Sequence, residues 1–262
     1  MSHQATLDIK NIPEHELARL REKAKELSGS TTDYQSEYSS LLTRRVNHEP
    51  LQYIEEYVPF YSISLKVDER CLIPRPETEY LVQIIKDNIE SPKKVLDVGT
   101  GSGCIALMMK SIFPNSEVTG IDISEEAIQL ANENSKLNSL EVSFFQSNLL
   151  ENVEESDHDL IVANLPYIPT ENLNELDREV IDYEPLTALN GGKDGLEIIS
   201  NLIKLKSIVK GIVNGCKKAE CELVGGETAE MPDTYEKGKF DIAGFAVGIV
   251  SKNKILEKKK IK

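Results

Sequence analysis

The sequence contains no long apolar run, since no stretch approaches the roughly 18 consecutive apolar residues of a membrane-spanning helix. A secretory signal pattern is also absent from its start. Its cysteines include no C-x-x-C pair, so neither disulfides nor a zinc site is expected of Cys71, Cys104, Cys216 and Cys221. We therefore expect a soluble, cytoplasmic protein with reduced thiols, no metal and no membrane partner.

Basic residues are scarce, with 30 Lys and Arg against 44 Asp and Glu, which leaves a formal net charge of −14. A polyphosphate partner favours a basic surface, so direct binding of nucleic acid is not expected. The one dense basic run, at residues 252–262, is typical of a solvated tail. The length of 262 residues suits one α/β domain with a small extra unit, and we expect a monomer.

A glycine-rich loop is the most informative local pattern. The apolar residues 95–98 predict a buried strand, G-T-G-S-G follows at residues 99–103, and residues 104–112 have helical character. Glycine permits a tight turn and lets the backbone approach a ligand, while the next helix directs its free N–H groups to the same place. Asp122 ends the following strand about 20 residues further on, where nucleotide-binding folds place a ribose-binding carboxylate.

The glycine pattern alone also fits a strand-to-helix turn with no ligand. A dinucleotide fold would place a third glycine where Cys104 stands. The G-x-G-x-G spacing instead resembles the adenosylmethionine loop of class I methyltransferases.

Strands and helices alternate after residue 93, which predicts an α/β fold with a parallel sheet and helices on both faces. Before it, the sequence predicts two amphipathic helices, the first with the stripe Leu17, Leu20, Ala24 and Leu27. A strand at 60–67, the linker I-P-R-P-E-T-E at 73–79 and a helix at 80–88 follow. The linker fits either a hinge with a helix start, in which Glu77 and Glu79 occupy the first turn, or a part of the site. The later elements are expected at 95–98, 104–112, 118–121, 125–137, 142–145 and 160–163. Ligands of such sheets bind beyond the carboxyl ends of the strands.

The segment N-L-P-Y at residues 164–167 directly follows the last of these strands. The side-chain oxygen of Asn164 and a nearby backbone carbonyl are two acceptors, which suit a planar NH2 group with two hydrogens to donate. The ring of Tyr167 can cover a flat amide or base. The alternative is a strand-ending turn with a proline and a buried tyrosine.

Residues 41 to about 203 resemble the PrmC/HemK family, the glutamine N5-methyltransferases of peptide chain release factors. The resemblance is carried by I-P-R-P-E-T-E at 73–79, D-V-G-T-G-S-G at 97–103, G-I-D-I-S at 120–124, residues 164–168 and E-P-L-T-A-L-N-G-G-K-D-G at 184–195. It implies a class I methyltransferase (Rossmann-like) fold. Methyl transfer from S-adenosyl-L-methionine to a glutamine amide of a release factor is the implied activity.

The resemblance also implies the site residues. Adenosylmethionine would be bound by Gly99, Thr100, Gly101, Ser102, Gly103, Asp122, Asn148, Leu149 and Asn164. The acceptor would be bound by Asn164, Leu165, Pro166 and Tyr167, with Asn164 and Tyr167 as the catalytic pair. Leu165 stands where the family has the first proline of N-P-P-Y, and N-L-P-Y also occurs in ribosomal RNA adenine dimethylases. The alternatives are therefore an N6-adenine nucleic-acid methyltransferase and an inactive cofactor-binding or scaffold protein.

The last quarter departs from that family. Residues 206 to about 256 resemble a fragment of the PurM family, phosphoribosylformylglycinamidine cyclo-ligase, through G-G-E-T-A-E-M-P at 225–232. The rest of that enzyme is missing, so no ATP-dependent synthetase activity is expected. We expect residues 223–226 to pack beside the fourth strand of the sheet and Glu227 to do no chemistry.

Four regions follow from these patterns. They are a helical substrate-recognition domain at 1–58, a strand and linker at 59–92, the adenosylmethionine-binding domain at 93–205, and the PurM-like fragment with its basic tail at 206–262.

Overall fold

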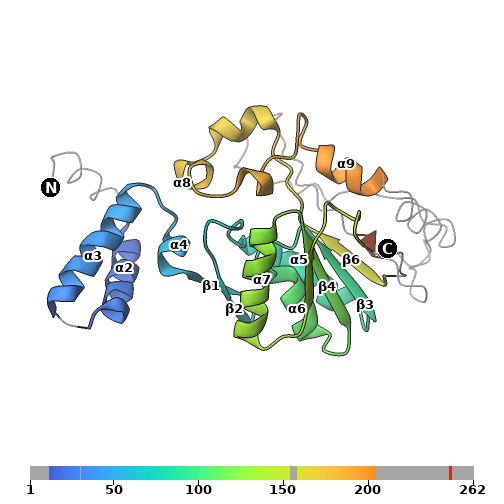
Figure 1. Cartoon of the computed structure of the whole chain (residues 1–262), viewed down its shortest axis with the longest axis horizontal. Helices are drawn as coiled ribbons and strands as arrows, with labels where there is room; N and C mark the ends of the chain where they lie inside the picture. Colours follow the sequence, from blue (N-terminus) through green and yellow to red (C-terminus); the bar gives the residue numbers. More distant parts are fainter. Residues whose placement is uncertain (1–11, 30, 154–157, 205–247, 250–262) are drawn as a thin grey trace, which may run out of the picture.

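A parallel sheet forms the centre of the protein (Figure 1). The computed structural model describes residues 12–29, 31–153, 158–204 and 248–249 of the 262-residue chain. Four of its strands are parallel and lie in the order β5-β4-β3-β6. They are β3 (Lys94–Val98), β4 (Glu117–Asp122), β5 (Ser143–Gln146) and β6 (Leu160–Ala163). The predicted strands and the parallel sheet are therefore confirmed, with boundaries within one residue.

The strands β3, β4 and β6 divide their side chains between the two faces of the sheet. Val95, Leu160 and Val162 belong to one buried cluster, whereas Leu96 and Ala163 belong to another. The first cluster includes apolar side chains of α5 (Pro76–Asn88) and α6 (Cys104–Ile112), and the second those of α9 (Glu197–Lys204). Strands buried on both faces explain why these segments read as continuous apolar runs.

The segments after β6 connect the sheet to the rest of the described chain. They are the 3₁₀ turn η1 (Thr170–Glu175), α8 (Arg178–Ile181) and the 3₁₀ turn η2 (Leu186–Ala188). An isolated bridge between Ile168 and Asn190 closes the loop that contains them. η2 thereby comes to lie over the carboxyl ends of the strands, where its residues line a cavity.

A pair of helices, α2 (Glu14–Leu27) and α3 (Thr31–Val46), lies beside the sheet-containing part (Figure 1). With the short α4 (Leu51–Glu55), which the sequence pattern did not predict, they form a separate apolar cluster around Leu20. Leu27 was expected in the apolar stripe, but this last residue of α2 is 50% exposed, whereas Leu20 and Ala24 are buried. Arg45 connects this pair to α8, donating hydrogen bonds to Glu16 and to Glu179.

The prediction of a single strand at residues 60–67 is wrong. The structure has an antiparallel hairpin of β1 (Tyr57–Phe60) and β2 (Ile63–Lys66). Tyr61, in the turn, has a left-handed backbone with φ of 53°. Its side chain is held outside the hairpin, because its hydroxyl donates to Gln83 and the Lys86 ammonium lies 5.4 Å from its ring centre. The alternating pattern ran across this turn and hid it, since the sequence there contains no glycine or asparagine.

The helix after the linker begins at Pro76 rather than at residue 80. A proline at the first helical position needs no hydrogen-bond partner for its missing N–H. As predicted, Glu77 and Glu79 lie in the first turn of this helix.

Gly248–Ile249 forms β7, which pairs antiparallel with β6 at the edge of the sheet. Residues 223–226, which were expected beside that strand, lie outside the described residues, as does Glu227. Within the described ranges, no helix is long and apolar enough to cross a membrane.

Candidate functional site

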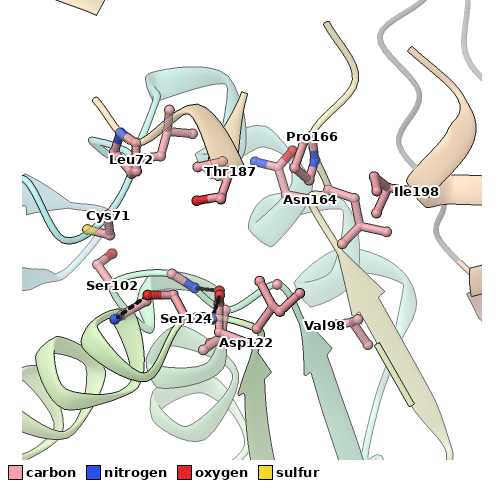
Figure 2. Close-up of a pocket in the computed structure, with 18 of the residues that line it drawn as sticks. Cys71, Leu72, Val98, Ser102, Asp122, Ser124, Asn164, Pro166, Thr187 and Ile198 are labelled. Carbon is pink, nitrogen blue, oxygen red and sulfur yellow. Dashed lines mark hydrogen bonds between the residues drawn. The ribbon is translucent and has the colours of Figure 1, made fainter. Parts of the chain in front are cut away.

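A cavity of ≈ 410 Å³ lies at the carboxyl ends of β3, β4 and β6. Figure 2 shows Ser102, Asp122 and Ser124 along one side of it, with Asn164, Pro166 and Thr187 along the other. The glycine loop, Asp122 and the segment after β6, each of which follows or ends a predicted strand, therefore line one cavity. The volume is within the usual range of small-molecule sites.

The glycine loop is held in place by two carboxylates. Asp97, the second-last residue of β3, accepts from the Thr100 hydroxyl at 2.6 Å and from the Ala106 backbone N–H at 3.1 Å. Asp122 accepts from the Gly101 N–H at 2.9 Å and from the Ser124 N–H at 3.0 Å. The loop is therefore preorganised by hydrogen bonds from both ends.

Gly101 and Gly103 are glycines for different reasons. A Cβ built on Gly101 would meet nothing within 4 Å, so at this residue the loop backbone faces open space in which a ligand fits. A Cβ on Gly103 would lie 3.1 Å from Phe144 and 3.2 Å from Ala131. Gly103 does not line the cavity, unlike the four loop residues before it. It lets α6 begin in close contact with β5 and α7 (Glu125–Asn138).

Two buried polar atoms in this loop have no hydrogen-bond partner within the described residues: Oδ1 of Asp97 and Oγ of Ser102. Ser102 lines the cavity, although its Oγ atom is itself buried. An unpaired buried polar group is costly.

Burial raises the pKa of the Asp97 carboxyl to about 7. The folded protein therefore retains a proton that the unfolded chain releases from about pH 4 upward, and this residue lowers stability as pH rises from about 4 to 7. We expect Asp97→Asn to become more stable relative to wild type over that interval. Urea unfolding of both proteins at about pH 5 and pH 8 measures this, and equal pH slopes would contradict the burial argument.

Asp122, at the end of β4, is mostly buried beside the loop, and this burial raises the pKa of its carboxyl. Two oxygens offer about four acceptor positions, of which the backbone N–H groups of Gly101 and Ser124 use two. The remaining positions can receive hydroxyl donors from a ligand in the cavity.

Ser147 shapes the loop after β5 and was not predicted from the sequence. Its hydroxyl donates to the Leu149 carbonyl at 2.7 Å and accepts from the Asn152 N–H at 3.1 Å. These bonds hold Leu149 at a left-handed φ of 49°, a conformation that costs a leucine about 1 kcal/mol or more. Asn148 and Leu149 both line the cavity, as expected for residues beside a bound nucleoside.

The N-L-P-Y segment contributes three of its four residues to the cavity wall: Asn164, Leu165 and Pro166. Leu165 is 4% exposed and packs in the apolar cluster of β3 and α9, so its side chain takes part in the core. Tyr167 does not line the cavity, and its side chain is 41% exposed. Its backbone is instead packed against Gly191 and Gly195.

The linker also reaches the cavity, through Arg75 and Thr78. The sequence left open whether this stretch is only a hinge. The hydroxyl of Thr78 accepts a hydrogen bond from the Asn164 side chain at 3.4 Å, which links it to a predicted site residue. The sequence pattern did not predict a site role for Thr78, which stands between two acids at a helix start.

The two described cysteines, Cys71 and Cys104, are free and also line the cavity. Burial raises the pKa of both thiols, that of Cys104 to about 12. They are therefore protonated at neutral pH and act as wall atoms rather than nucleophiles. Within the described ranges, no group of three or more His, Cys, Asp or Glu side chains is placed to hold a metal.

Comparison of the sequence with known protein families gives two matches, one of them to a methyltransferase family. Residues 76–192 match the family described as Methyltransferase small domain. Residues 184–250 match the family described as AIR synthase related protein, N-terminal domain. Both resemblances inferred from the sequence are therefore confirmed, and the two matches overlap at residues 184–192.

Similar curated proteins are named release factor glutamine methyltransferase. That of Thermodesulfovibrio yellowstonii is 40% identical, over 66% of this chain and 64% of its own length. That of Lactococcus lactis is 42% identical over 65% and 64%, and that of Streptococcus pneumoniae 47% identical over 58% and 54%. The chain thus spans less than two thirds of the length of these relatives.

Proposed function

We propose that this protein transfers a methyl group from S-adenosyl-L-methionine to the side-chain amide nitrogen of a glutamine in a peptide chain release factor. The observation that carries the proposal is the convergence of the glycine loop, Asp122 and Asn164 on one cavity. The names of its relatives support the choice of a release factor as substrate.

Adenosylmethionine fits the chemistry of the cavity wall. The open backbone at Gly101 accommodates a ligand, and the free acceptor positions of Asp122 suit the two ribose hydroxyls. Ser102 forms part of the wall, while Leu149 and Ile123 give apolar surface for a flat base. Gly99, Thr100 and Asn148 complete the proposed cofactor-binding wall, and Gly103 supports it through packing.

Bound adenosylmethionine supplies a methyl group on a sulfonium, which the acceptor nitrogen takes with its own electron pair while the S–C pair stays on sulfur. The protein's task is mainly orientation. The Oδ1 atom of Asn164 and the backbone carbonyl of Leu165 accept one hydrogen bond each from the NH2 group of the acceptor amide. These bonds strengthen as positive charge develops on the nitrogen, and one of the two protons is then released to water.

Tyr167 and Pro166 complete the proposed acceptor site. Because Tyr167 lies outside the cavity wall, we propose that its ring covers the acceptor at the cavity mouth once the protein substrate is bound. We also propose that the helical region 1–58 contributes to recognition of that substrate, with residues 93–205 as the cofactor-binding domain. The hydrogen bond that Arg45 of the helical region donates to Glu179 of the cofactor-binding domain would connect the two.

To test the function, the full chain is incubated with labelled adenosylmethionine and one of two acceptors. The acceptor is either a purified release factor or an adenine-containing oligonucleotide. We expect label in the release factor alone. Label in the oligonucleotide would favour the N6-adenine activity that N-L-P-Y also permits. Cofactor binding without transfer to either acceptor would favour a scaffold role.

Asp122→Ala should weaken adenosylmethionine binding by about 1–3 kcal/mol, because hydrogen bonds to a charged group are lost. Calorimetry with the full chain measures this change. Asp159→Ala is the matched control, since Asp159 also accepts from two backbone N–H groups, at 2.7 and 3.0 Å, but at the opposite end of β3. Equal affinity in the Asp122 variant, or an equal loss in both variants, would contradict the assignment.

A further inference from the structure

The side chain of Asn164 must present its oxygen, and not its NH2 group, to an acceptor amide. If the carboxamide of Asn164 is flipped, its NH2 group faces the NH2 group of the acceptor amide. Two hydrogen-bond donors then meet, and no hydrogen bond forms. The two orientations of an asparagine side chain have nearly the same shape, so packing alone does not select between them. A neighbouring hydrogen-bonding group has to make that selection.

Thr78 is placed to make it. The Nδ2 atom of Asn164 lies 3.4 Å from the Thr78 hydroxyl oxygen, across 86 positions of sequence. Thr78 is 3% exposed and lines the cavity beside Asn164. A hydroxyl can donate as well as accept, and in this structure it accepts from Nδ2, which leaves Oδ1 at the other end of the planar carboxamide and free of this contact.

The position of Thr78 is itself fixed by buried contacts. Its backbone N–H donates to the Arg75 carbonyl at 3.0 Å in the first turn of α5. The Glu184 carboxylate accepts from the Arg75 guanidinium at 2.5 Å and from the Ile73 backbone N–H at 3.1 Å. Glu184 is 4% exposed, so these bonds tie the linker to the segment before η2 within the protein interior.

We propose that Thr78 is a positioning residue, which orients the Asn164 carboxamide so that its oxygen faces the acceptor amide. This inference rests on the proposed function, because it gives Asn164 the role of receiving that amide. Thr78 touches no reacting atom and acts through Asn164. It accounts for a hydroxyl-bearing residue between the two acids of R-P-E-T-E.

The test compares Thr78→Val, which keeps the shape and removes the hydroxyl, with Thr78→Ser, which keeps the hydroxyl. The valine variant should lower kcat on a release factor by about 5–10-fold, the loss of one hydrogen bond, with the affinity for adenosylmethionine retained. The serine variant should recover most of that loss. In an Asn164→Ala background, Thr78→Val should change the residual rate no further, since the two residues act as one unit.

A second measurement does not depend on activity. In the full chain with labelled asparagine, the side-chain NH2 signals of Asn164 should shift and exchange faster in Thr78→Val, but not in Thr78→Ser. Unchanged signals and unchanged kcat in Thr78→Val would overturn the inference while leaving the proposed function intact. Changed signals in a protein that methylates no release factor would retain the contact and reject the function. A further loss in the Asn164→Ala background would show a merely structural role.

Discussion

Asn164→Ala should lower kcat for methyl transfer to a release factor by about 100-fold or more, while its affinity for adenosylmethionine stays near that of wild type. Preorganised hydrogen bonds at a reacting centre have effects of this size. Asn164 lies after β6 and the glycine loop after β3, on opposite sides of the cavity, so the acceptor and cofactor contacts are separable. Steady-state kinetics and calorimetry on the same protein measure the two quantities.

Asn138→Ala is the matched control for this change. Asn138 donates from its side chain to the Ser64 carbonyl at 2.8 Å, between α7 and the hairpin, and is not part of the cavity wall. Its loss should leave kcat unchanged. Normal turnover in the Asn164 variant would show that Asn164 does not orient the acceptor, and the proposed use of N-L-P-Y would then be wrong.

Arg75→Met should destabilise the protein by roughly 2–4 kcal/mol, because it leaves the buried Glu184 carboxylate without its cation. The estimate lies below that for a fully buried pair, since the Arg75 side chain is 37% exposed. Burial already raises the pKa of the Glu184 carboxyl against the effect of Arg75. Without Arg75 the pKa rises further, so the loss of stability should grow as pH increases.

Urea unfolding of single and double variants measures this effect. Glu184→Gln is the matched variant, because it removes the charge and keeps an acceptor for the Ile73 N–H. Arg75→Met with Glu184→Gln should be more stable than Arg75→Met alone, since the uncompensated charge is gone. A single Arg75 variant within about 0.5 kcal/mol of wild type would show that the pair does not hold the linker.

The strands β3, β4 and β6 could be predicted because they are buried on both faces of the sheet, and the glycine loop because its backbone has positive φ at Gly99, Gly101 and Gly103. Residues 160–163 and 104–112 were predicted with their observed boundaries. The hairpin was missed because Tyr61 is an unusual residue for a left-handed turn position. The short helix at residues 51–55 was missed because five residues carry too little periodicity to distinguish it from a loop.

The site also contains residues that could be predicted from the sequence and residues that could not. Gly101, Asp122 and Asn164 lie at or just beyond the carboxyl ends of strands of one parallel sheet, so their convergence follows from topology. Thr78 and Glu184 reach the site region only through contacts across 86 and 109 positions, for which the local sequence holds no signal. The exposed position of Tyr167 likewise depends on the packing of its backbone against Gly191 and Gly195.

The measurement that tests the central claim most directly is mass spectrometry of a release factor after incubation with this protein and adenosylmethionine. The account predicts one added methyl group, located by fragmentation on the side-chain nitrogen of a single glutamine, and its absence when Asn164→Ala replaces wild type. An unmodified release factor, or a methyl group on any other atom, would contradict the account.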